Sequence, residues 1–385
     1  MKITMLGHKA IPSHRGGIEH VLTSLCPLLV EKGMEVTCYN RSSDRVEEDF
    51  QAEIKQGVFQ GVKLRKAPTL PLRGASAMIA SFTAAIRATF SRADVIHFHA
   101  EGPCAAMWIP RLFGKKCVAT VHGLDWQREK WGKGFASKYI HFGEKMLVRY
   151  ADRVIVLSES AADYFRETYD RETVLIHNGI SPRTRRAADQ IRERFSLESG
   201  EYICVVARLC AEKGIHYLID AYRTLSTDKK LVIVGDTGDT ESTDPYIELL
   251  REKAKGCENI LFTGFASGVL LDELYSNAYF AVLPSDLEGM SMSLLEAFAY
   301  GNAVLCSDIP ENSLVATDRA EYFKKSNVED LAEKMAYLLA QPQRVKELSE
   351  GAAEYILNRY GWDGVAEKTV ALYRELISDK KGKKV

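Results

Sequence analysis

The sequence lacks the short motifs that identify several common classes of enzyme. It contains no HExxH motif, no CxxC pair and no DxD-like cluster at an expected strand end, so no metal site is predicted. It also has no P-loop of the GxxxxGKS or GxxxxGKT form and no GxSxG elbow, which disfavours a kinase and a hydrolase. Its chemistry therefore has to be inferred from where individual polar residues fall.

Long apolar runs and a strong excess of charge are also lacking. No stretch is long enough to cross a bilayer, and the first residues contain no apolar segment of signal-peptide length. The formal net charge is -1, whereas a general nucleic-acid binder usually has a basic excess. Several of the eight cysteines lie in apolar runs, which indicates buried free thiols of a reducing compartment. We expect a cytoplasmic protein that binds no nucleic acid.

Short apolar runs alternate with helical patterns along most of the chain. Strands separated by helices predict a parallel sheet with helices on both faces. The runs form two series: Ile3–Leu6, Val36–Tyr39, Val95–Phe98, Cys117–Val121, Val154–Leu157 and Val174–Ile176, then Tyr202–Ala207, Leu231–Val234, Ile260–Phe262, Tyr279–Leu283, Ala303–Cys306 and Tyr322–Phe323.

The segment Asn178–Arg194 lies between the two series, has no strand pattern and is the best candidate for a linker. We expect an α/β protein of two Rossmann-like doubly wound domains, over residues 1–182 and 190–360. A last apolar helix over Val365–Ile377 follows a break at Tyr360–Gly361. Ligands of such sheets bind beyond the carboxyl ends of the strands, so two domains facing a central cleft would suit a substrate with two ends.

The strongest local signal is the stretch from Pro284 to Gly301, where a strand is followed by a loop and a helix. Ser291 or Ser293 is expected to cap the helix, whose free backbone N–H groups suit a diphosphate. Glu288 and Glu296 are eight residues apart, about 12 Å along a helix, so they do not form a facing acid and base pair. They are interpreted as anchors for two ends of an elongated ligand; the alternative is a pair of solvated carboxylates.

A second signal is the pair Arg208 and Lys213, which follows the first strand of the second domain. Two fixed cations near a helix N-terminus can hold a diphosphate and neutralise it as it leaves, without a metal. Taken singly, each would more often be a solvated surface residue. Their position at a strand end favours the functional interpretation.

Signals in the first domain are weaker. Gly16 and Gly17 lie where the first loop meets the first helix, and glycines there allow close approach of a phosphate, although a plain tight turn explains them as well. His122 ends a buried strand and is either structural or part of a ligand site. Asp125 and Trp126 follow it and either contact an acceptor or pack a loop.

These motifs, in this order, resemble those of the family-4 glycosyltransferases, which have the GT-B fold. The likeness rests on the glycine pair, on His122, on Arg208-x4-Lys213-Gly and on Glu288-x7-Glu296-Ala-x-Ala-x-Gly, and it covers nearly the whole chain. The stretches GHKAIPSHRGGIEH and HGLDWQREKW are similar to the subgroup that includes bacterial rhamnosyltransferases of surface polysaccharides.

The resemblance implies a role for each motif. The Gly16–Gly17 loop, Arg208 and Lys213 would hold the diphosphate of a nucleotide-sugar donor. Glu296 would bind the ribose, Glu288 would face the sugar, and His122 would lie near it. The remaining donor-binding candidates are Gly264 and Phe265 in the expected base-binding loop, and Gly289, Met290 and Ser291 beside Glu288.

The resemblance further implies a retaining, α-linking transfer without metal or cofactor, onto a glycan or lipid-linked acceptor. The final helix would cross back to the first domain. One departure is Ala303, which replaces the proline that usually follows the donor helix in the family. Little consequence is expected, because a strand can begin at Ala303 without it.

Residues 63–92 combine basic and apolar side chains and contain no Asp or Glu. Such a segment can lie on an anionic membrane, although a helix packed on the first sheet is an equal alternative. The basic residues are Lys63, Arg65, Lys66, Arg73, Arg87 and Arg92.

Two rival functions stay open. A sugar-nucleotide isomerase of the 2-epimerase type would need several acid and base residues around the sugar, and only His122 and Glu288 are evident. A non-catalytic glycan-binding partner would be expected to lose some of the charged residues named above, and this chain has all of them.

Overall fold

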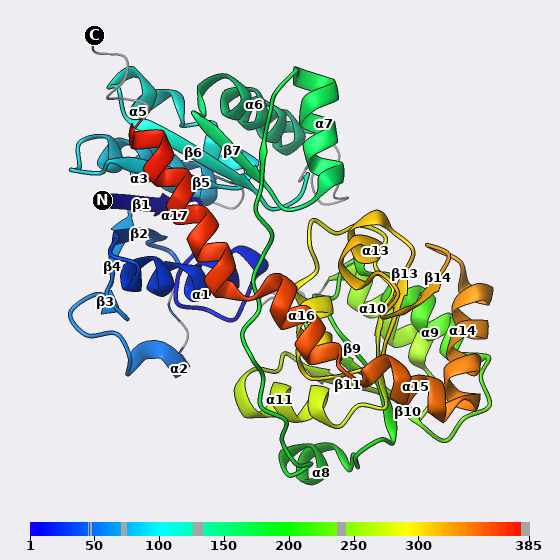
Figure 1. The fold of residues 1–385 in the computed structure, drawn as a ribbon. Helices are drawn as coiled ribbons and strands as arrows, with labels where there is room; N and C mark the ends of the chain where they lie inside the picture. The colour runs from blue at the N-terminus through cyan, green and yellow to red at the C-terminus, as the bar shows by residue number, and fades with distance from the viewer. Residues whose placement is uncertain are drawn as a thin grey trace. The chain divides into compact units, whose positions relative to one another are not determined.

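The computed structural model describes residues 1–44, 46, 48–70, 75–124, 126, 134–236 and 244–378. The chain divides into two compact units, Met1–Gly179 with Trp362–Val385, and Ile180–Gly361. Each unit is built on a largely parallel sheet with helices around it (Figure 1). The expected fold class of two Rossmann-like α/β domains is therefore confirmed.

The sheet of the first unit has the strand order β3-β4-β2-β1-β5-β6-β7-β8, and all its described pairs are parallel except β3 with β4. Its strands are β1 (Lys2–Leu6), β2 (Glu35–Arg41), β3 (Val58–Phe59), β4 (Val62–Ala67), β5 (Val95–His99), β6 (Lys116–Val121), β7 (Arg153–Val156) and β8 (Val174–Leu175). Its helices are α1 (Gly17–Glu31), α2 (Glu48–Gln51), α3 (Ser76–Thr89), α4 (Glu101–Cys104), α5 (Trp108–Leu112), α6 (Phe135–Tyr150), α7 (Glu159–Tyr169) and α17 (Trp362–Ser378).

The last helix, α17, belongs to the first unit, although it is far from the rest of that unit in sequence. It packs against α1, and Figure 1 shows the two side by side. Gly179 lies against the ring of Trp362, where a Cβ would come within 2.3 Å of the indole. Only glycine fits at this contact. The chain leaves the first unit at Gly179 and re-enters it at Trp362, so the two crossing points are in contact with each other.

The second unit has a fully parallel sheet in the order β11-β10-β9-β12-β13-β14. Its strands are β9 (Tyr202–Val206), β10 (Lys230–Val234), β11 (Ile260–Gly264), β12 (Phe280–Leu283), β13 (Val304–Ser307) and β14 (Glu321–Phe323). Its helices are α8 (Gln190–Phe195), the 3-10 helix η3 (Ala211–Lys213), α9 (Ile215–Arg223), α10 (Pro245–Ala254), α11 (Gly268–Ser276), α12 (Met292–Ala299), α13 (Pro310–Ala316), α14 (Val328–Ala340), α15 (Pro342–Ser349) and α16 (Ala352–Tyr360).

Strand β9 shows why this sheet is covered on both sides. Ile203 and Val205 belong to one buried cluster, and Tyr202 and Cys204 belong to another. Since successive side chains of a strand point to opposite faces, both faces of β9 are buried, which a near-continuous apolar strand predicts.

The structure refines three expectations. The segment 180–189 lies in the second unit, where Arg183 and Arg186 form ion pairs. Residues 63–67 of the basic segment lie in the strand β4, and residues 76–89 are helical. All eight cysteines are free, but Cys210 and Cys257 are only partly buried, so the expectation of buried thiols is wrong for these two.

Two findings concern membranes and metals. Among the described residues, no helix is both long and apolar enough to span a bilayer. The same part of the chain contains no group of three or more His, Cys, Asp or Glu side chains placed to hold a metal ion.

Candidate functional site

The loops after β9 and β12 meet at the topological switch point of the second sheet. The chain adds β10 and β11 on one side of β9, and β13 and β14 on the far side of β12. At such a point the loops at the carboxyl ends diverge and leave a crevice where ligands of α/β sheets bind. Arg208 and Lys213 lie in one of these loops and Glu288 in the other, so the residues of the two strongest sequence signals come together.

Gly214 sets the contact between the two loops. Its φ is +65°, and a Cβ there would lie 2.0 Å from the carbonyl oxygen of Pro284. The backbone N–H of Asp286 also donates a 2.8 Å hydrogen bond to the carbonyl of Glu212. The side chain of Asp286 accepts hydrogen bonds from Tyr217 at 3.0 Å and from Ser326 at 2.7 Å. The loops are therefore held together by backbone contacts that leave no room for a side chain.

Lys213 and Glu288 form a close ion pair across the two loops. The Nζ atom of Lys213 lies 2.5 Å from Oε1 of Glu288, and the hydroxyl of Ser285 donates to the same oxygen at 2.7 Å. The side chains of Lys213 and Glu288 are only 19% and 8% exposed. The family resemblance assigned Lys213 to the diphosphate and Glu288 to the sugar, as separate contacts. In the structure the two side chains form an ion pair, so each fixes the position of the other.

Arg208 is the more open of the two cations. Its guanidinium lies 3.2 Å from the carboxylate of Glu212, one turn further on, and its side chain is 45% exposed. The contact is made by Nη2 of the guanidinium. A half-exposed guanidinium beside a fixed lysine is suited to binding a diphosphate through several hydrogen bonds.

Glu296 lies on α12, the helix that follows the loop carrying Glu288. The helix is capped by Ser291, whose hydroxyl accepts a 3.3 Å hydrogen bond from the N–H of Leu294. Glu296 is largely buried and forms a 3.0 Å ion pair with Arg183, and Tyr275 donates to its other oxygen at 3.4 Å. The sequence did not single out Arg183, because the partnership joins residues 113 positions apart.

Three further donor-binding candidates, Gly289, Met290 and Ser291, fall between Glu288 and α12. Met290 is buried, and Ser291 acts as the helix cap. The two residues of the expected base-binding loop, Gly264 and Phe265, lie at and after the end of β11. Gly264 has a φ of +73° with open space where a Cβ would stand, and its carbonyl accepts the N–H of Gly235 at 2.9 Å.

In the first unit, Gly16 is the residue at which the loop needs glycine. Its φ is +91°, and a Cβ there would lie 2.3 Å from a carboxylate oxygen of Glu19. Gly17 has no neighbour within 4 Å of a Cβ, so the structure requires only one of the two glycines. The other oxygen of Glu19 accepts the backbone N–H of Lys9 at 2.7 Å, and burial raises the pKa of this carboxyl group. The loop is thus folded over a buried glutamate.

His122 contacts a second histidine that sequence reasoning missed. Its Nε2 atom lies 3.1 Å from Nδ1 of His99, and the ring of His99 stacks on that of His97 with centroids 4.3 Å apart. His97 in turn contacts the hydroxyls of Thr120 at 2.7 Å and Tyr373 at 2.5 Å. The sequence signal that could have identified His99 is the presence of two histidines, His97 and His99, at alternate positions of the otherwise apolar strand β5.

The remaining acceptor candidates divide between described and undescribed residues. Asp125 lies outside the residues that the structure describes. Trp126 is half-buried, and its ring lies 5.6 Å from that of His141 and 5.8 Å from that of Tyr164. Trp126 therefore packs in an aromatic cluster of the first unit.

Burial of neutral histidines in the first unit predicts acid sensitivity. Burial lowers the pKa of His8 to about 4 and that of His97 to about 3, and it also lowers the pKa of His99. In the unfolded chain these groups take up protons below pH 6.5, whereas in the folded chain they stay neutral. Their contribution is therefore fully present above pH 6.5 and is lost as the pH falls.

Between pH 6.5 and 5, His8 and His97 should each lower the free energy of unfolding by about 2 kcal/mol. Denaturant titrations at pH 7.5, 6.5 and 5 measure this loss directly. A free energy of unfolding that stays constant over this range would contradict the neutral, buried state of these rings.

Family models match both parts of the chain. The model described as Glycosyltransferase Family 4 matches residues 15–184, and the model described as Glycosyl transferases group 1 matches residues 188–355. Together they cover every donor-binding candidate named above and all the strands of both sheets except β1.

Two curated relatives illustrate the range of similar proteins. The chain is 27% identical over 348 residues to alpha-maltose-1-phosphate synthase of Mycolicibacterium smegmatis, covering 80% of this chain and 86% of that one. It is 26% identical over 297 residues to N,N'-diacetylbacillosaminyl-diphospho-undecaprenol alpha-1,3-N-acetylgalactosaminyltransferase of Campylobacter jejuni, covering 72% of this chain and 74% of that one.

Among solved structures, the HepE protein of Anabaena in complex with UDP-glucose superposes with a TM-score of 0.78. The match covers 98% of this chain and 100% of that chain at 16% sequence identity. At this identity the likeness concerns the fold.

Proposed function

Because the chain belongs to the GT-B glycosyltransferases of the group 1 and family 4 type, we propose that it transfers a sugar from a nucleoside-diphosphate donor to a glycan or lipid-linked acceptor. The observation that carries the proposal is the meeting of Arg208, Lys213 and Glu288 at the switch point of the second sheet. By its name, one relative transfers N-acetylgalactosamine to a sugar linked to diphospho-undecaprenol, which is a lipid-linked acceptor.

In this proposal the second unit binds the donor. Arg208 and Lys213 bind the diphosphate and neutralise the charge that develops on it as the bond to the sugar breaks. Glu288 holds the lysine in place and presents its carboxylate to the sugar hydroxyls, and the first turn of α12 adds free backbone N–H groups. Glu296, held by Arg183, binds the ribose. The proposal needs no metal and no cofactor, because two fixed cations supply the positive charge.

For the first unit the proposal rests more on the family resemblance. Gly16, Gly17 and His122 are assigned to the donor, and Asp125 and Trp126 to the acceptor. Transfer with retention of the anomeric configuration and a role in bacterial cell-surface polysaccharide synthesis are further parts of the proposal. Measuring the anomeric configuration of the product by NMR tests the first of these.

A donor screen tests the function. The protein is mixed with UDP-, GDP-, dTDP- and ADP-sugars, with and without glycan and lipid-linked acceptors, and release of nucleoside diphosphate is measured. Release that depends on an acceptor supports the transferase. Conversion to a new sugar nucleotide without release would support the isomerase, and no change of any donor would support a non-catalytic binding role.

A membrane role for residues 63–92 is a separate part of the proposal. Lys63, Arg65 and Lys66 on and near β4 are exposed, as are Ile86 and Phe90 at the end of α3. Exposed basic and apolar side chains of this kind bind anionic lipid surfaces.

Vesicles that contain anionic lipid are therefore expected to retain more protein than neutral vesicles. Replacing Lys66 by Gln should weaken this retention about fivefold, since each nearby basic residue contributes about 1 kcal/mol. The matched control is Arg192→Gln in the second unit, which should leave retention unchanged. Equal retention on neutral and anionic vesicles would remove the membrane role.

A further inference from the structure

A largely apolar pocket lies within the first unit, at the carboxyl ends of β1, β2 and β4. Its volume is about 520 Å³, which lies within the range of roughly 300–1,000 Å³ typical of small-molecule sites. The helices α3 and α6 form its walls, and no Asp or Glu is among the described residues that line it. Small side chains at Ala77, Ala80 and Ala84 recur on one face of α3 and leave the space open.

Two of the residues that line the pocket carry buried polar atoms without a hydrogen-bond partner in the described part of the chain. These atoms are Nδ1 of His8 and the hydroxyl of Tyr139. Nε of Arg41 also makes no hydrogen bond there, but it lies 3.6 Å from the carboxylate of Asp44. Because an unsatisfied buried polar group is unfavourable, the atoms of His8 and Tyr139 beside one cavity point to a ligand that pairs with them.

The hydrogen bonds of Asn40 fix the chemical character of His8. The side-chain amide of Asn40 donates to the carbonyl of Ile11 at 2.8 Å, and its oxygen accepts the N–H of Ile11 at 3.2 Å. The same oxygen lies 2.9 Å from Nε2 of His8, so Nε2 must carry the proton. The unpaired Nδ1 is then a hydrogen-bond acceptor, which is suited to a ligand hydroxyl.

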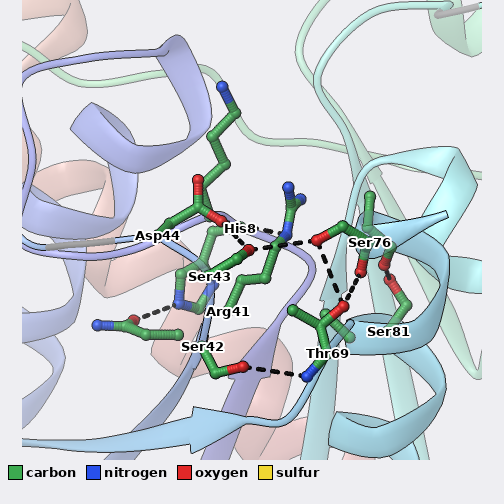
Figure 2. Close-up of polar contacts among 12 residues, drawn as sticks. His8, Arg41, Ser42, Ser43, Asp44, Thr69, Ser76 and Ser81 are labelled. Carbon is green, nitrogen blue, oxygen red and sulfur yellow. Dashed lines mark hydrogen bonds and ion pairs between the residues drawn. The ribbon is translucent and has the colours of Figure 1, made fainter. Parts of the chain in front are cut away.

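Hydrogen bonds near the pocket hold the start of α3 to the loops that follow β2 and β4. Figure 2 shows Thr69 between Ser42 and Ser76: its backbone N–H donates to Ser42 at 3.0 Å, and its hydroxyl donates to the carbonyl of Ser76 at 2.6 Å. The hydroxyls of Ser43 and Ser76 lie 3.2 Å apart. Ser81, which lines the pocket, donates to the carbonyl of Ala77 and so leaves no free donor. The start of α3 is therefore fixed before a ligand arrives.

We propose that this pocket binds the hydrocarbon segment of a glycolipid acceptor, with a hydroxyl of its head group bonded to His8. The inference rests on the proposed function and names the acceptor class of that function. The apolar walls accept the hydrocarbon, while Arg41 and Tyr139 donate to oxygen atoms where the chain joins the head.

Binding of alkyl glucosides to the whole protein tests this without donor or turnover. Methyl, butyl and octyl β-glucoside, each below its micelle concentration, are titrated calorimetrically. Each added methylene should tighten binding by up to about fourfold, so octyl glucoside should bind at least about tenfold more tightly than butyl glucoside. Affinity that does not rise with chain length would overturn the proposal, as would tighter binding of phenyl than of hexyl glucoside, which would indicate an aromatic occupant.

The variant Ala77→Leu places a larger side chain at the pocket, and its control is Ala371→Leu at an exposed position of α17 in the same unit. Ala77→Leu should weaken octyl glucoside binding about tenfold and leave methyl glucoside unaffected, and the control should change neither. Unchanged octyl glucoside binding in Ala77→Leu would place the hydrocarbon elsewhere.

A second variant separates binding from folding. Tyr139→Phe removes a buried hydroxyl that has no partner among the described residues, so it should raise the melting temperature while weakening octyl glucoside binding. Equal affinity in this variant would remove Tyr139 from the site. These assays contain no nucleotide, so their failure leaves the donor screen untouched, and failure of the donor screen does not affect them.

Discussion

Replacement of Arg208 by alanine is expected to lower the rate of sugar transfer by a factor of about 10² to 10³. Its guanidinium is the half-exposed cation of the proposed donor site, and its ion pair with Glu212 lies within a single turn. The diphosphate would lose a bidentate partner at the moment when its negative charge increases. Turnover with a saturating donor, measured as release of nucleoside diphosphate, gives the effect.

Stability of the Arg208→Ala variant should fall by about 1 kcal/mol at most, because the guanidinium is 45% exposed, although the carboxylate of Glu212 is only 14% exposed. Arg192→Ala is the control for loss of an arginine ion pair in the second unit, and its pair with Glu198 is exposed on both sides. Arg208→Lys should recover only part of the rate, because a lysine cannot make the bidentate contact. Near-normal turnover of Arg208→Ala would remove the residue from the site.

Replacement of Gly214 by alanine is expected to damage both stability and turnover. The new Cβ would meet the carbonyl of Pro284 at 2.0 Å, at a φ of +65° that already disfavours a side chain. Backbone strain alone costs about 1–2 kcal/mol, and relief of the clash would separate the loops that carry Lys213 and Glu288. A shift of about 1 Å at a reacting centre can cost about 10²-fold in rate.

The matched control for this variant is Gly256→Ala. Gly256 has a φ of +77° in the same unit, but nothing lies within 4 Å of a Cβ there. It should lose about 1–2 kcal/mol of unfolding free energy and keep its turnover. If both variants lose the same stability and keep the same activity, the contact of the two loops has no role in the site.

Much of the fold was predictable because its strands are almost wholly apolar. The run Tyr202–Ala207 was predicted and β9 spans Tyr202–Val206, and the predicted helix at Val365–Ile377 corresponds to α17. At the position where the family usually has proline, the strand expected to begin at Ala303 begins one residue later, as β13 at Val304. The strand β4 was not predicted. Lys63, Arg65 and Lys66 do not alternate regularly with apolar residues, so the sequence has no strand pattern there. In the structure five residues of β4 pair with β2.

The placement of the proposed donor-binding residues at strand ends was predictable, and their partners were not. A strand followed by Arg208 and another followed by Glu288 can be recognised locally, but the adjacency of β9 and β12 depends on strand order. The ion pair of Lys213 with Glu288 and that of Arg183 with Glu296 follow from this long-range geometry. His99 was missed for a different reason: a histidine within a buried strand is most often structural, and only its contact with His122 distinguishes it.

Binding of nucleoside diphosphate to the free enzyme tests the central claim, which is that Arg208 and Lys213 hold the diphosphate of the donor. UDP, GDP, dTDP and ADP are titrated into the wild type and into Arg208→Ala by calorimetry, with and without EDTA. The wild type should bind at least one of them with a single site, equally well in EDTA, and Arg208→Ala should bind it at least about tenfold more weakly. Equal affinities of the two proteins, or binding that disappears in EDTA, would contradict a metal-free diphosphate site at the ends of β9 and β12.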